Sequence, residues 1–474
     1  MITHEKVNRR WEAVLANRLR ALGYQLSVRP TPSRISAYCG FDAVLSVEAL
    51  RFGNTLASRS ESLPPVDIGP AALIIDLTAA AGVQNAPVLT LDIGGRHGIE
   101  AGMAQMLSTG QLPDLLTRLD GRVVGLARPM LGDRVWLSRM SDDVLAAAMS
   151  LLVQTVGRHF AGTLATLEVA PGPAPARGFL RHYLPSLARG LKARLIQKLR
   201  RRRRPFYWQV AYRLIDGPGI AETGRLDGAP FTVLPDDGAR FYADPFVLDH
   251  GGRHYVFVEE FPYATGRGVI SVAELADDGR LGIPAVIIEE PHHLSYPQVF
   301  RHAGEIFMIP ESSGAREVVL YRADRFPNHW VRDAVLMADV DFNDATLLEK
   351  DGRFWLIGTE RFGPGSASDT MAVYSAPSLR GPWQPHALNP IAIDRSAARP
   401  GGAFIRTETS VLMPVQDGAN SYGGGLGLME LCRLDAGDVV FSPPHPIGPG
   451  PAWDRGGIHT LNRVGRLEVI DSAG

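Results

Sequence analysis

Cysteine is scarce in this sequence, and long apolar runs are missing. The 474 residues include two cysteines, Cys39 and Cys432, whose wide separation makes neither a disulfide framework nor a metal-binding spacing. No stretch of about 18 apolar residues is present to span a bilayer. Residues 1–19 are charged and lack the apolar core of a signal peptide. We therefore expect a soluble protein of a reducing compartment, the cytoplasm.

Net charge is also nearly absent, at −1, but the charges are segregated along the chain. Residues 169–215 contain no Asp or Glu and 12 Lys or Arg, whereas the rest of the chain holds 37 basic and 50 acidic residues. Within this stretch, residues 179–204 place apolar side chains about one helical turn apart, although Pro185 and Gly190 weaken a continuous helix. Such a basic amphipathic segment fits two interpretations: a helix packed between domains, or contact with an anionic membrane surface at the inner face. A single basic run without interleaved aromatic residues argues against nucleic acid as a partner.

Residues 1–170 have the pattern of an α/β domain. Apolar residues recur at helical spacing from Trp11 to Leu22, and residues 72–79 and 86–95 look like buried parallel strands followed by turns. We expect a helix over residues 141–160, with Ser141 as its N-cap and an acidic first turn.

Glycine and proline are plentiful, with 50 and 35 residues, which favours short strands joined by turns in the remainder of the chain. A Pro-rich linker and the basic segment occupy residues 171–206. We therefore predict a multidomain chain, in which an N-terminal α/β domain (residues 1–170) and this linker precede an all-β region at residues 207–474.

The all-β region repeats a unit of strand, turn and strand. In four copies the unit ends on a polar residue that lies sixteen positions after its start: Asp244 to Glu260, Ser295 to Glu311, Asp344 to Glu360 and Pro400 to Gln416. The four starts lie 51, 49 and 56 residues apart, and residues 457–471 form a looser fifth copy. Strand-rich repeats of this length are typical of propeller blades, so we predict a five-bladed β-propeller.

The first strand of each blade begins near the central funnel of a propeller. We therefore expect five residues at or beside these starts to converge: Asp244, Tyr296, Asp344, Arg399 and His459. A buried carboxylate without a partner is costly, so the recurring carboxylates at the strand ends should be paired or used: Glu260, Glu311 and Glu360. Because neighbours on a strand face opposite sides, one of Glu259 and Glu260 is expected inside the funnel.

Motifs spread over about 230 residues carry a family resemblance, among them ADPF, HLSYPQVF, LYRADRFPNHW, ARPGGAF and GIHTL. They resemble the N-terminal domain of the plant glucosamine inositolphosphorylceramide transferases, and bacterial relatives of that domain in surface-glycan contexts. More distantly, the region resembles the five-bladed propellers of glycoside hydrolase families forty-three and thirty-two. The separate catalytic domain of the transferases is not visible in this sequence.

The hydrolase resemblance implies roles for individual residues. Asp244 stands where those propellers have their general base, and Asp344 where they have a carboxylate that tunes a pKa. Arg399 stands where they have the acid, and an arginine cannot donate a proton at neutral pH. Glu311 or Glu260 would have to supply that proton. Arg399 could instead clamp an anionic or phosphate-linked sugar, or form an ion pair with an inner aspartate.

The remaining candidates are assigned to binding. Tyr296, beside Pro297, is a candidate for stacking on a sugar, and His459 and Glu360 complete the proposed binding set. Trp208, Trp330, Trp355 and Trp383 are interpreted as blade core. His292 and His293 are interpreted as loop residues without a third ligand at metal spacing, so no metal and no cofactor are predicted.

The N-terminal region resembles, more weakly, the formyltransferase-like domains that sometimes accompany such a propeller. Those enzymes need an Asn-His-Asp constellation and a His-Pro-Ser-type loop, and neither is found. LDIGGRHG stands in the place of the loop, with Asp92 and His97 as remnants. Formyl transfer is therefore not expected of this domain.

Three functions stay open at this point. The first is a protein of surface polysaccharide or glycolipid biosynthesis that binds, and processes or transfers, an anionic sugar in the funnel. The second is a furanosidase-type glycoside hydrolase, and the third a non-catalytic protein that binds or scaffolds a glycan. An enzyme needs at least two convergent ionisable groups, whereas a binding module needs only a pocket of aromatic and polar side chains.

Overall fold

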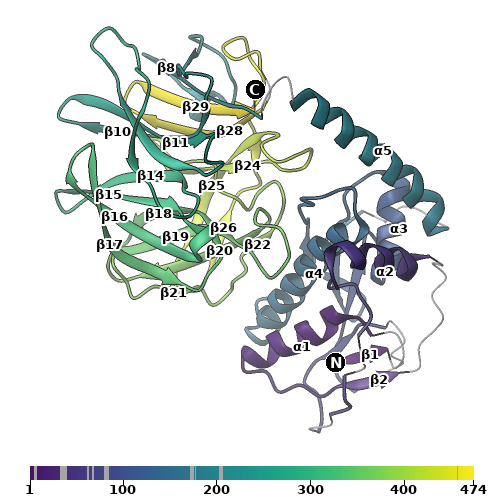
Figure 1. The fold of residues 1–474 in the computed structure, drawn as a ribbon. Coiled ribbons are helices and arrows are strands. Elements are labelled where there is room, and N and C mark those ends of the chain that lie inside the picture. The colour runs from purple at the N-terminus through teal and green to yellow at the C-terminus, as the bar shows by residue number, and fades with distance from the viewer. Residues whose placement is uncertain are drawn as a thin grey trace. The chain divides into compact units, whose positions relative to one another are not determined.

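The computed structural model comprises two compact units (Figure 1). It describes residues 1–4, 8–31, 40–60, 63–66, 69–78, 85–170, 176, 178–201, 206–455 and 457–473. The first unit consists of residues 1–203 with 362–366, and the second of residues 204–361 with 367–474. Three features of the sequence lie outside the described residues: Cys39, most of the Pro-rich linker at 171–178, and the basic run at 202–204.

The first unit is built on a mixed sheet of seven strands, so the α/β class is confirmed. The strands are β1 (Ile2–His4), β2 (Arg29–Thr31), β3 (Ile74–Asp76), β4 (Val88–Ile93), β5 (Arg96–His97), β6 (Leu115–Leu119) and β7 (Arg122–Ala127). Their order is β2-β1-β3-β4-β6-β7, with β5 paired to β4. Strands β3 and β4 pair in parallel, as their apolar runs indicated, whereas β6 joins β4 in antiparallel orientation.

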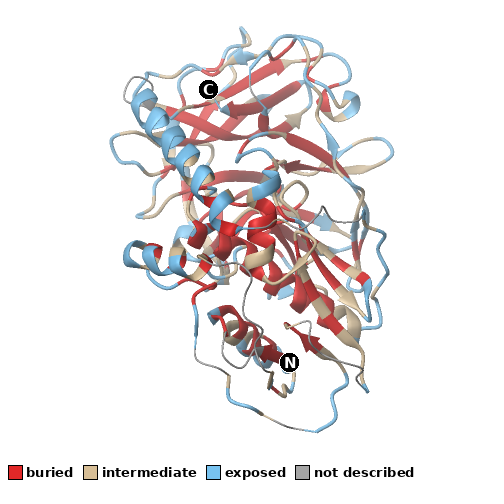
Figure 2. Ribbon diagram, turned by 90° about the vertical axis from the view of Figure 1, so that its right-hand side faces the viewer, coloured by how far each residue is buried: buried red, intermediate tan, exposed pale blue. Residues whose placement is uncertain are grey.

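Five helices accompany this sheet in the described part of the unit: α1 (Arg10–Ala21), α2 (Phe41–Phe52), α3 (Ile99–Thr109), α4 (Leu137–Phe160) and α5 (Phe179–Arg201). Helix α1 coincides with the predicted amphipathic segment. Helix α4 is buried over nearly all of its length, including its polar residues (Figure 2). Helix α5 is continuous through Pro185 and Gly190, so the helix predicted over the basic segment forms in spite of both residues.

Helix α4 begins at Leu137, four residues before the predicted N-cap Ser141, which lies buried inside the helix. The cap comes from another element: the carboxylate of Glu48 in α2 accepts hydrogen bonds from the backbone amides of Leu137 (3.1 Å) and Ser138 (2.8 Å). A carboxylate satisfies the exposed amides of a helix start as a Ser side chain would. The assignment of Ser141 as N-cap was therefore wrong.

Replacing Glu48 with alanine should lower the free energy of unfolding of this unit by about 2–4 kcal/mol. Glu48 also accepts a hydrogen bond from the hydroxyl of Tyr183 in α5, so the substitution leaves three buried donors without their acceptor. Urea unfolding would measure the change, with Glu168→Ala, at an exposed position of the same unit, as the control. Equal stability of the two variants would contradict this account of the cap.

The second unit is a five-bladed β-propeller, as the repeat predicted (Figure 1). Blade one contains β10 (Arg240–His250), β11 (Arg253–Pro262), β12 (Val269–Glu274) and β13 (Ala285–Ile288). Blade two contains β14 (Ser295–His302), β15 (Glu305–Glu311), β16 (Glu317–Arg325) and β17 (His329–Ala338), with the short helix η1 (Ser313–Ala315) after β15. Blade three contains β18 (Phe342–Lys350), β19 (Arg353–Glu360), β20 (Thr370–Ala376) and β21 (Gln384–Pro385), with β22 (Ala392–Ile393) paired to β20.

The last two blades differ in how they are assembled. Blade four contains β23 (Ile405–Arg406), β24 (Val411–Gln416), β25 (Leu426–Leu434) and β26 (Val439–Phe441), with β27 (His445–Pro446) paired to β25. Blade five combines β28 (Ile458–Val464) and β29 (Leu467–Ala473) with β8 (Trp208–Leu214) and β9 (Thr232–Val233), and the short helix α6 (Ile220–Thr223) lies between β8 and β9. Strand β8 pairs with β29 from Trp208 opposite Ala473 to Leu214 opposite Leu467. The two ends of the unit thus close the ring of blades in one sheet.

The apolar core lies between successive blades. One cluster joins Phe257 and Ile270 of blade one to Val299 and Met308 of blade two, and comparable clusters follow around the ring. In the described part of the chain, no helix combines the length and apolarity that crossing a bilayer requires.

Candidate functional site

A recurring backbone irregularity directs side chains toward the centre of the propeller. Asp244, Tyr296 and Asp344 have φ angles of 48°, 45° and 52°, a left-handed conformation that side-chain-bearing residues seldom adopt. Each lies where the register of its first strand shifts, which is the signature of a β-bulge. A bulge changes the direction in which a side chain points. Blades one, two and three each have such a bulge near the start of their first strand.

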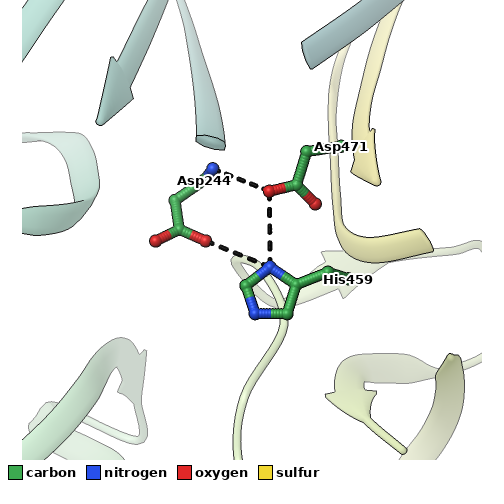
Figure 3. Close-up of side chains that lie close together, drawn as sticks. All are labelled: Asp244, His459 and Asp471. Carbon is green, nitrogen blue, oxygen red and sulfur yellow. Dashed lines mark hydrogen bonds and ion pairs between the residues drawn. The ribbon is translucent and has the colours of Figure 1, made fainter. Parts of the chain in front are cut away.

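In blade five, His459 lies at a similar register shift, between Ile458 and Thr460, and meets two aspartates. Its Nδ1 atom lies 3.3 Å from Oδ2 of Asp471 and 3.4 Å from Oδ1 of Asp244 (Figure 3). The backbone amide of Asp244 donates to Oδ2 of Asp471 over 2.8 Å. The starts of blades one and five are thus joined through a buried histidine.

The three groups differ in protonation because burial and mutual contact act on each differently. Burial raises the pKa of Asp244 well above its ordinary value, although the neighbouring His459 opposes this rise. Burial would also raise the pKa of Asp471, but His459 and the hydrogen bonds from Asp244 and Thr460 hold it below its ordinary value. For His459, burial lowers the pKa, but the attraction of Asp471 outweighs it and leaves the pKa raised. Asp471 is therefore the ionised partner that holds a protonated His459.

Asp244, His459 and Asp471 also offer ligand atoms that lie within 4.8 Å of one another, a spacing that a metal ion could bridge. Oδ1 of Asp471, however, already accepts hydrogen bonds from the amide (2.8 Å) and hydroxyl (2.9 Å) of Thr460. Asp471 can therefore orient the imidazole of His459 through these contacts, which is as good an explanation of the arrangement as a bound cation. The Nε2 atom of His459 is buried and has no hydrogen-bond partner among the described residues, and His459 lines the cavity described below.

Blades two, three and four are linked through Tyr296. Its backbone amide donates to Oδ2 of Asp244 (3.3 Å), and its hydroxyl lies 2.9 Å from Oγ1 of Thr346 and 3.1 Å from the carbonyl oxygen of Gly402. The ring is fully buried. Tyr296 thus lies in the core and not along the cavity lining, where a stacking residue would be needed.

Arg399 and Asp344 form the ion pair that the sequence left as one of two alternatives. The guanidinium Nε lies 2.6 Å from Oδ2 of Asp344, and Nη2 lies 3.1 Å from Oδ1, so the pair is bidentate. Nη1 donates to the hydroxyl of Ser368 (3.0 Å), and Gln416 donates to Oδ2 of Asp344 (2.8 Å). Arg399 lines the cavity. Asp344 does not line it, but its carboxylate holds the guanidinium of Arg399 in place.

The cavity at the propeller has a volume of about 450 Å³. Its carboxyl groups come from three residues of blades one and two: Asp244, Glu259 and Glu311. Its basic side chains are Arg399, His293 and His459. Its wall is aromatic, formed by Phe206, Trp208, Phe241, Phe261, Tyr263 and Tyr422.

Glu259 is the cavity-facing member of the adjacent glutamates. Burial, reinforced by repulsion from Glu311, raises the pKa of Glu259 to about 8. Its Oε1 lies 3.3 Å from Nε2 of His293. Nδ1 of His293 accepts a hydrogen bond from the amide of Gly268 (2.9 Å), so the neutral ring carries its proton on Nε2, toward Glu259. Burial lowers the pKa of His293, which favours this neutral form.

Glu311 ends the apolar strand β15 and enters the same cavity. Burial raises its pKa to about 7, although the hydroxyl and the amide of Ser313 both donate hydrogen bonds to Oε1 and oppose this rise. A carboxyl group that titrates near neutrality can give up its proton during a reaction at physiological pH. The chemistry available here is therefore proton transfer in a cavity with an aromatic wall.

Besides Asp344 and Tyr296, two more of the proposed site residues lie outside the cavity lining. Glu260 faces the other side of β11, where it pairs with Arg240 and accepts a hydrogen bond from Ser271 (2.7 Å). Glu360 accepts a hydrogen bond from the hydroxyl of Tyr374 (2.9 Å). Both are structural partners here, and we transfer the assisting role of Glu260 to Glu259.

Several cavity residues were not found from the sequence. Trp208 lines the cavity and lies 4.7 Å from the ring of His459, whereas Trp330, Trp355 and Trp383 do belong to blade cores. The loop residue His293 was missed as well, and so was Asp471, the partner of His459. The fifth repeat could have indicated Asp471, because Asp471 is the polar residue that ends that repeat.

In the first unit, Asp92 and His97, the two residues interpreted as formyltransferase-like remnants, each contact a residue of the same unit. Asp92 pairs with Arg118 over 2.7 Å, and Nε2 of His97 donates to the carbonyl oxygen of Leu77 over 3.0 Å. Neither contact indicates a reaction centre.

Part of the propeller is similar to a known protein family. Residues 234–439 match the family model described as "Glucosamine inositolphosphorylceramide transferase 1, N-terminal". The propeller is thus similar to this type of domain over those residues. The matched residues include Asp244, Glu259, Glu311 and Arg399 but stop before His459 and Asp471.

Plant proteins match over the same region. "Glucosamine inositolphosphorylceramide transferase 1" of Oryza sativa subsp. indica is 37% identical over 213 residues, which is 43% of this chain and 28% of the rice protein. The protein of that name from Arabidopsis thaliana is 34% identical over 189 residues, or 39% of this chain and 25% of the plant protein. The matched part of this chain thus spans about a quarter of the length of these relatives.

Solved structures are similar at a greater distance. An exo-beta-1,3-galactanase from Clostridium thermocellum matches with a TM-score of 0.38 and 12% identity, over 50% of this chain and 59% of that one. A putative glycoside hydrolase from Bacteroides ovatus matches with a TM-score of 0.37 and 11% identity, over 49% of this chain and 86% of that one.

Proposed function

We propose that this protein acts in surface polysaccharide or glycolipid biosynthesis, and that the propeller cavity binds a sugar and processes or transfers it. One observation carries the proposal: three buried carboxyl groups, Asp244, Glu259 and Glu311, converge on a cavity walled by aromatic side chains. Aromatic rings suit the apolar face of a sugar, and carboxyl groups suit its hydroxyls. The plant relatives are named as transferases, which supports glycosyl transfer over other reactions.

In this proposal Glu311 is the general acid and Asp244 the general base. Glu311 gives its proton to the oxygen that leaves the sugar, as a carboxyl group with a pKa of about 7 can do at neutral pH. Because burial raises the pKa of Asp244, its carboxylate is a stronger base than that of an ordinary aspartate once it has lost its own proton. In that ionised form Asp244 accepts the proton of the attacking hydroxyl. His459 and Asp471 are positioning residues for Asp244: the protonated imidazole stabilises the carboxylate, and Asp471 keeps the imidazole in place.

The contacts of Arg399 help to decide whether the bound sugar is neutral or anionic. Because Asp344 neutralises the guanidinium and Ser368 occupies its third nitrogen, Arg399 is a weaker clamp for an anion than a free arginine would be. We therefore favour recognition of the sugar ring by carboxyl and aromatic groups. An anionic or phosphate-linked sugar held at Arg399 is the alternative.

A furanosidase-type hydrolase is the second candidate function, because the same acid and base would serve if water replaced the acceptor hydroxyl. A non-catalytic glycan-binding protein is less well supported. It would need the aromatic wall but would have no use for carboxyl groups that titrate near neutrality.

A thermal-shift screen tests whether a sugar binds in this cavity. Nucleotide sugars, phosphorylated sugars and neutral furanosides would be added to the full chain, since a bound ligand raises the melting temperature. We expect a rise with at least one class, and its loss in Tyr422→Ala. Tyr422 is a cavity residue that is 48% exposed, so this variant should fold. Val335→Ser, at a site 47% exposed outside the cavity lining, is the matched control.

The same screen separates neutral from anionic sugars. Arg399→Ala alone would leave Asp344 buried without its partner, so the informative variant is Arg399→Ala combined with Asp344→Asn, which removes both charges. Loss of the shift for anionic sugars alone would establish the anion clamp. If no sugar raises the melting temperature, or if Tyr422→Ala leaves the rise unchanged, a sugar does not bind in this cavity.

A further inference from the structure

Helix α5 is fixed to the first unit along one face only. Phe179 and Tyr183 are 1% and 2% exposed, and the ring of Phe179 packs edge-on against Phe41 at 5.2 Å. The hydroxyl of Tyr183 donates to Glu48. The early part of α5 is therefore part of the core of this unit.

The same face holds the helix further along. Gly190 lies directly against Val135, since a Cβ atom at this position would come within 2.7 Å of Cγ2 of Val135. One turn later, Arg194 pairs with Asp133 over 2.6 Å. The helix is thus held down from Phe179 to Arg194, and its orientation on this unit is fixed.

The other face of α5 presents an apolar stripe to solvent. Its leucines have exposed fractions of 55% (Leu184), 43% (Leu191), 59% (Leu195) and 53% (Leu199). Their spacings of seven, four and four residues place them in one line along the helix. In Figure 2 a long helix is coloured as exposed over most of its length. An apolar line of this length on a surface indicates a binding partner.

The charges around this stripe are all of one sign. Exposed cations accompany it along the helix: Arg181, Arg189, Lys192, Lys198 and Arg200. Residues 169–215 contain no acidic side chain at all. An ordinary solvated helix interleaves charges of both signs, so the surface of α5 complements something that is both apolar and anionic.

We propose that α5 docks the chain on the surface of an anionic lipid bilayer. The leucines of the stripe enter the boundary between headgroups and acyl chains, while the flanking lysines and arginines remain among the anionic headgroups. Neither contribution is strong alone, and the two together give stable but reversible binding. This surface belongs to the first unit, so the proposal does not depend on the proposed function of the propeller.

Flotation of the full chain with lipid vesicles tests the docking. We expect binding to phosphatidylcholine vesicles that contain phosphatidylglycerol and little binding to pure phosphatidylcholine. Leu191→Ser combined with Leu195→Ser should weaken binding at least about tenfold, because both leucines lose their buried area. Lys192→Gln combined with Lys198→Gln should weaken it by about fivefold per charge. Ile283→Ser, which alters a propeller residue that is 57% exposed, is the matched control.

Two results would overturn the proposal. One is an absence of binding to the anionic vesicles by the wild-type chain. The other is binding that the double leucine variant retains in full. If the leucine variant instead changes the oligomeric state and no vesicle binding is seen, the stripe is a protein–protein interface and the lipid proposal is wrong. Circular dichroism of each variant would establish that α5 still forms.

Discussion

Glu311→Gln is expected to lower turnover of the bound sugar by about 10²–10⁴-fold while its Kd changes by only a few-fold. Glutamine keeps the shape of the side chain and can still accept the hydrogen bonds from Ser313, but it has no proton to give. In the wild type, turnover should decline as the pH rises through about 7, because Glu311 then loses its proton. That decline should disappear in the variant, which pH–rate profiles would measure.

Glu360→Gln is the matched control for this experiment. It removes the carboxylate at the end of the corresponding strand of blade three, where Glu360 accepts a hydrogen bond from Tyr374 and does not line the cavity. Turnover should stay near the wild-type value. Turnover that survives in Glu311→Gln, or falls equally in both variants, would show that Glu311 is not the acid.

Glu259→Gln is expected to make the protein more stable than the wild type at alkaline pH. The pKa of Glu259 is raised to about 8 in the folded protein, from an unfolded value near 4.5. The folded state therefore binds more protons between these values, and stability falls as the pH rises through this window. The difference between these two pKa values corresponds to about 5 kcal/mol of lost stability by about pH 9, and removing the buried carboxyl should relieve this loss.

Chemical denaturation at pH values below and above this window would measure the effect. The variant and the wild type should be similar at the acidic end and diverge as the pH rises. Glu408→Gln, at an exposed glutamate, is the control for loss of a carboxyl group as such. A wild-type stability that is constant across the window would contradict the raised pKa of Glu259.

The sequence predicts the propeller well because each blade repeats one pattern of strands and turns. It predicts the cavity residues less well, because a shift of one residue on a strand moves a side chain to the opposite face. In the structure, Ala243, Ser295 and Asn343 pair with Glu259, Glu311 and Thr359. The sixteen-residue spacing began one residue later in blades one and three, at Asp244 and Asp344. It therefore selected Glu260 and Glu360, which lie outside the cavity lining, but selected Glu311, which lies inside.

Contacts between distant segments account for what the sequence could not reveal. Glu48 caps a helix that begins 89 residues later. The cavity wall combines Phe206 and Trp208, from the beginning of the propeller unit, with Tyr422 of blade four. Local periodicity does not indicate such encounters, because they arise only when the ring of blades closes. The bulges could not be predicted from the sequence either, since nothing in the identity of Tyr296 indicates a positive φ.

The central claim is that the cavity carboxyl groups act on a sugar bound among them. A crystal structure of the full chain with the sugar identified by thermal shift tests it most directly. The account predicts that the sugar lies in the cavity against the aromatic wall, with its leaving oxygen within hydrogen-bond distance of Glu311 and Asp244 near the position of the attacking group. A sugar bound elsewhere on the chain, or one whose leaving oxygen points away from both carboxyl groups, would contradict the account.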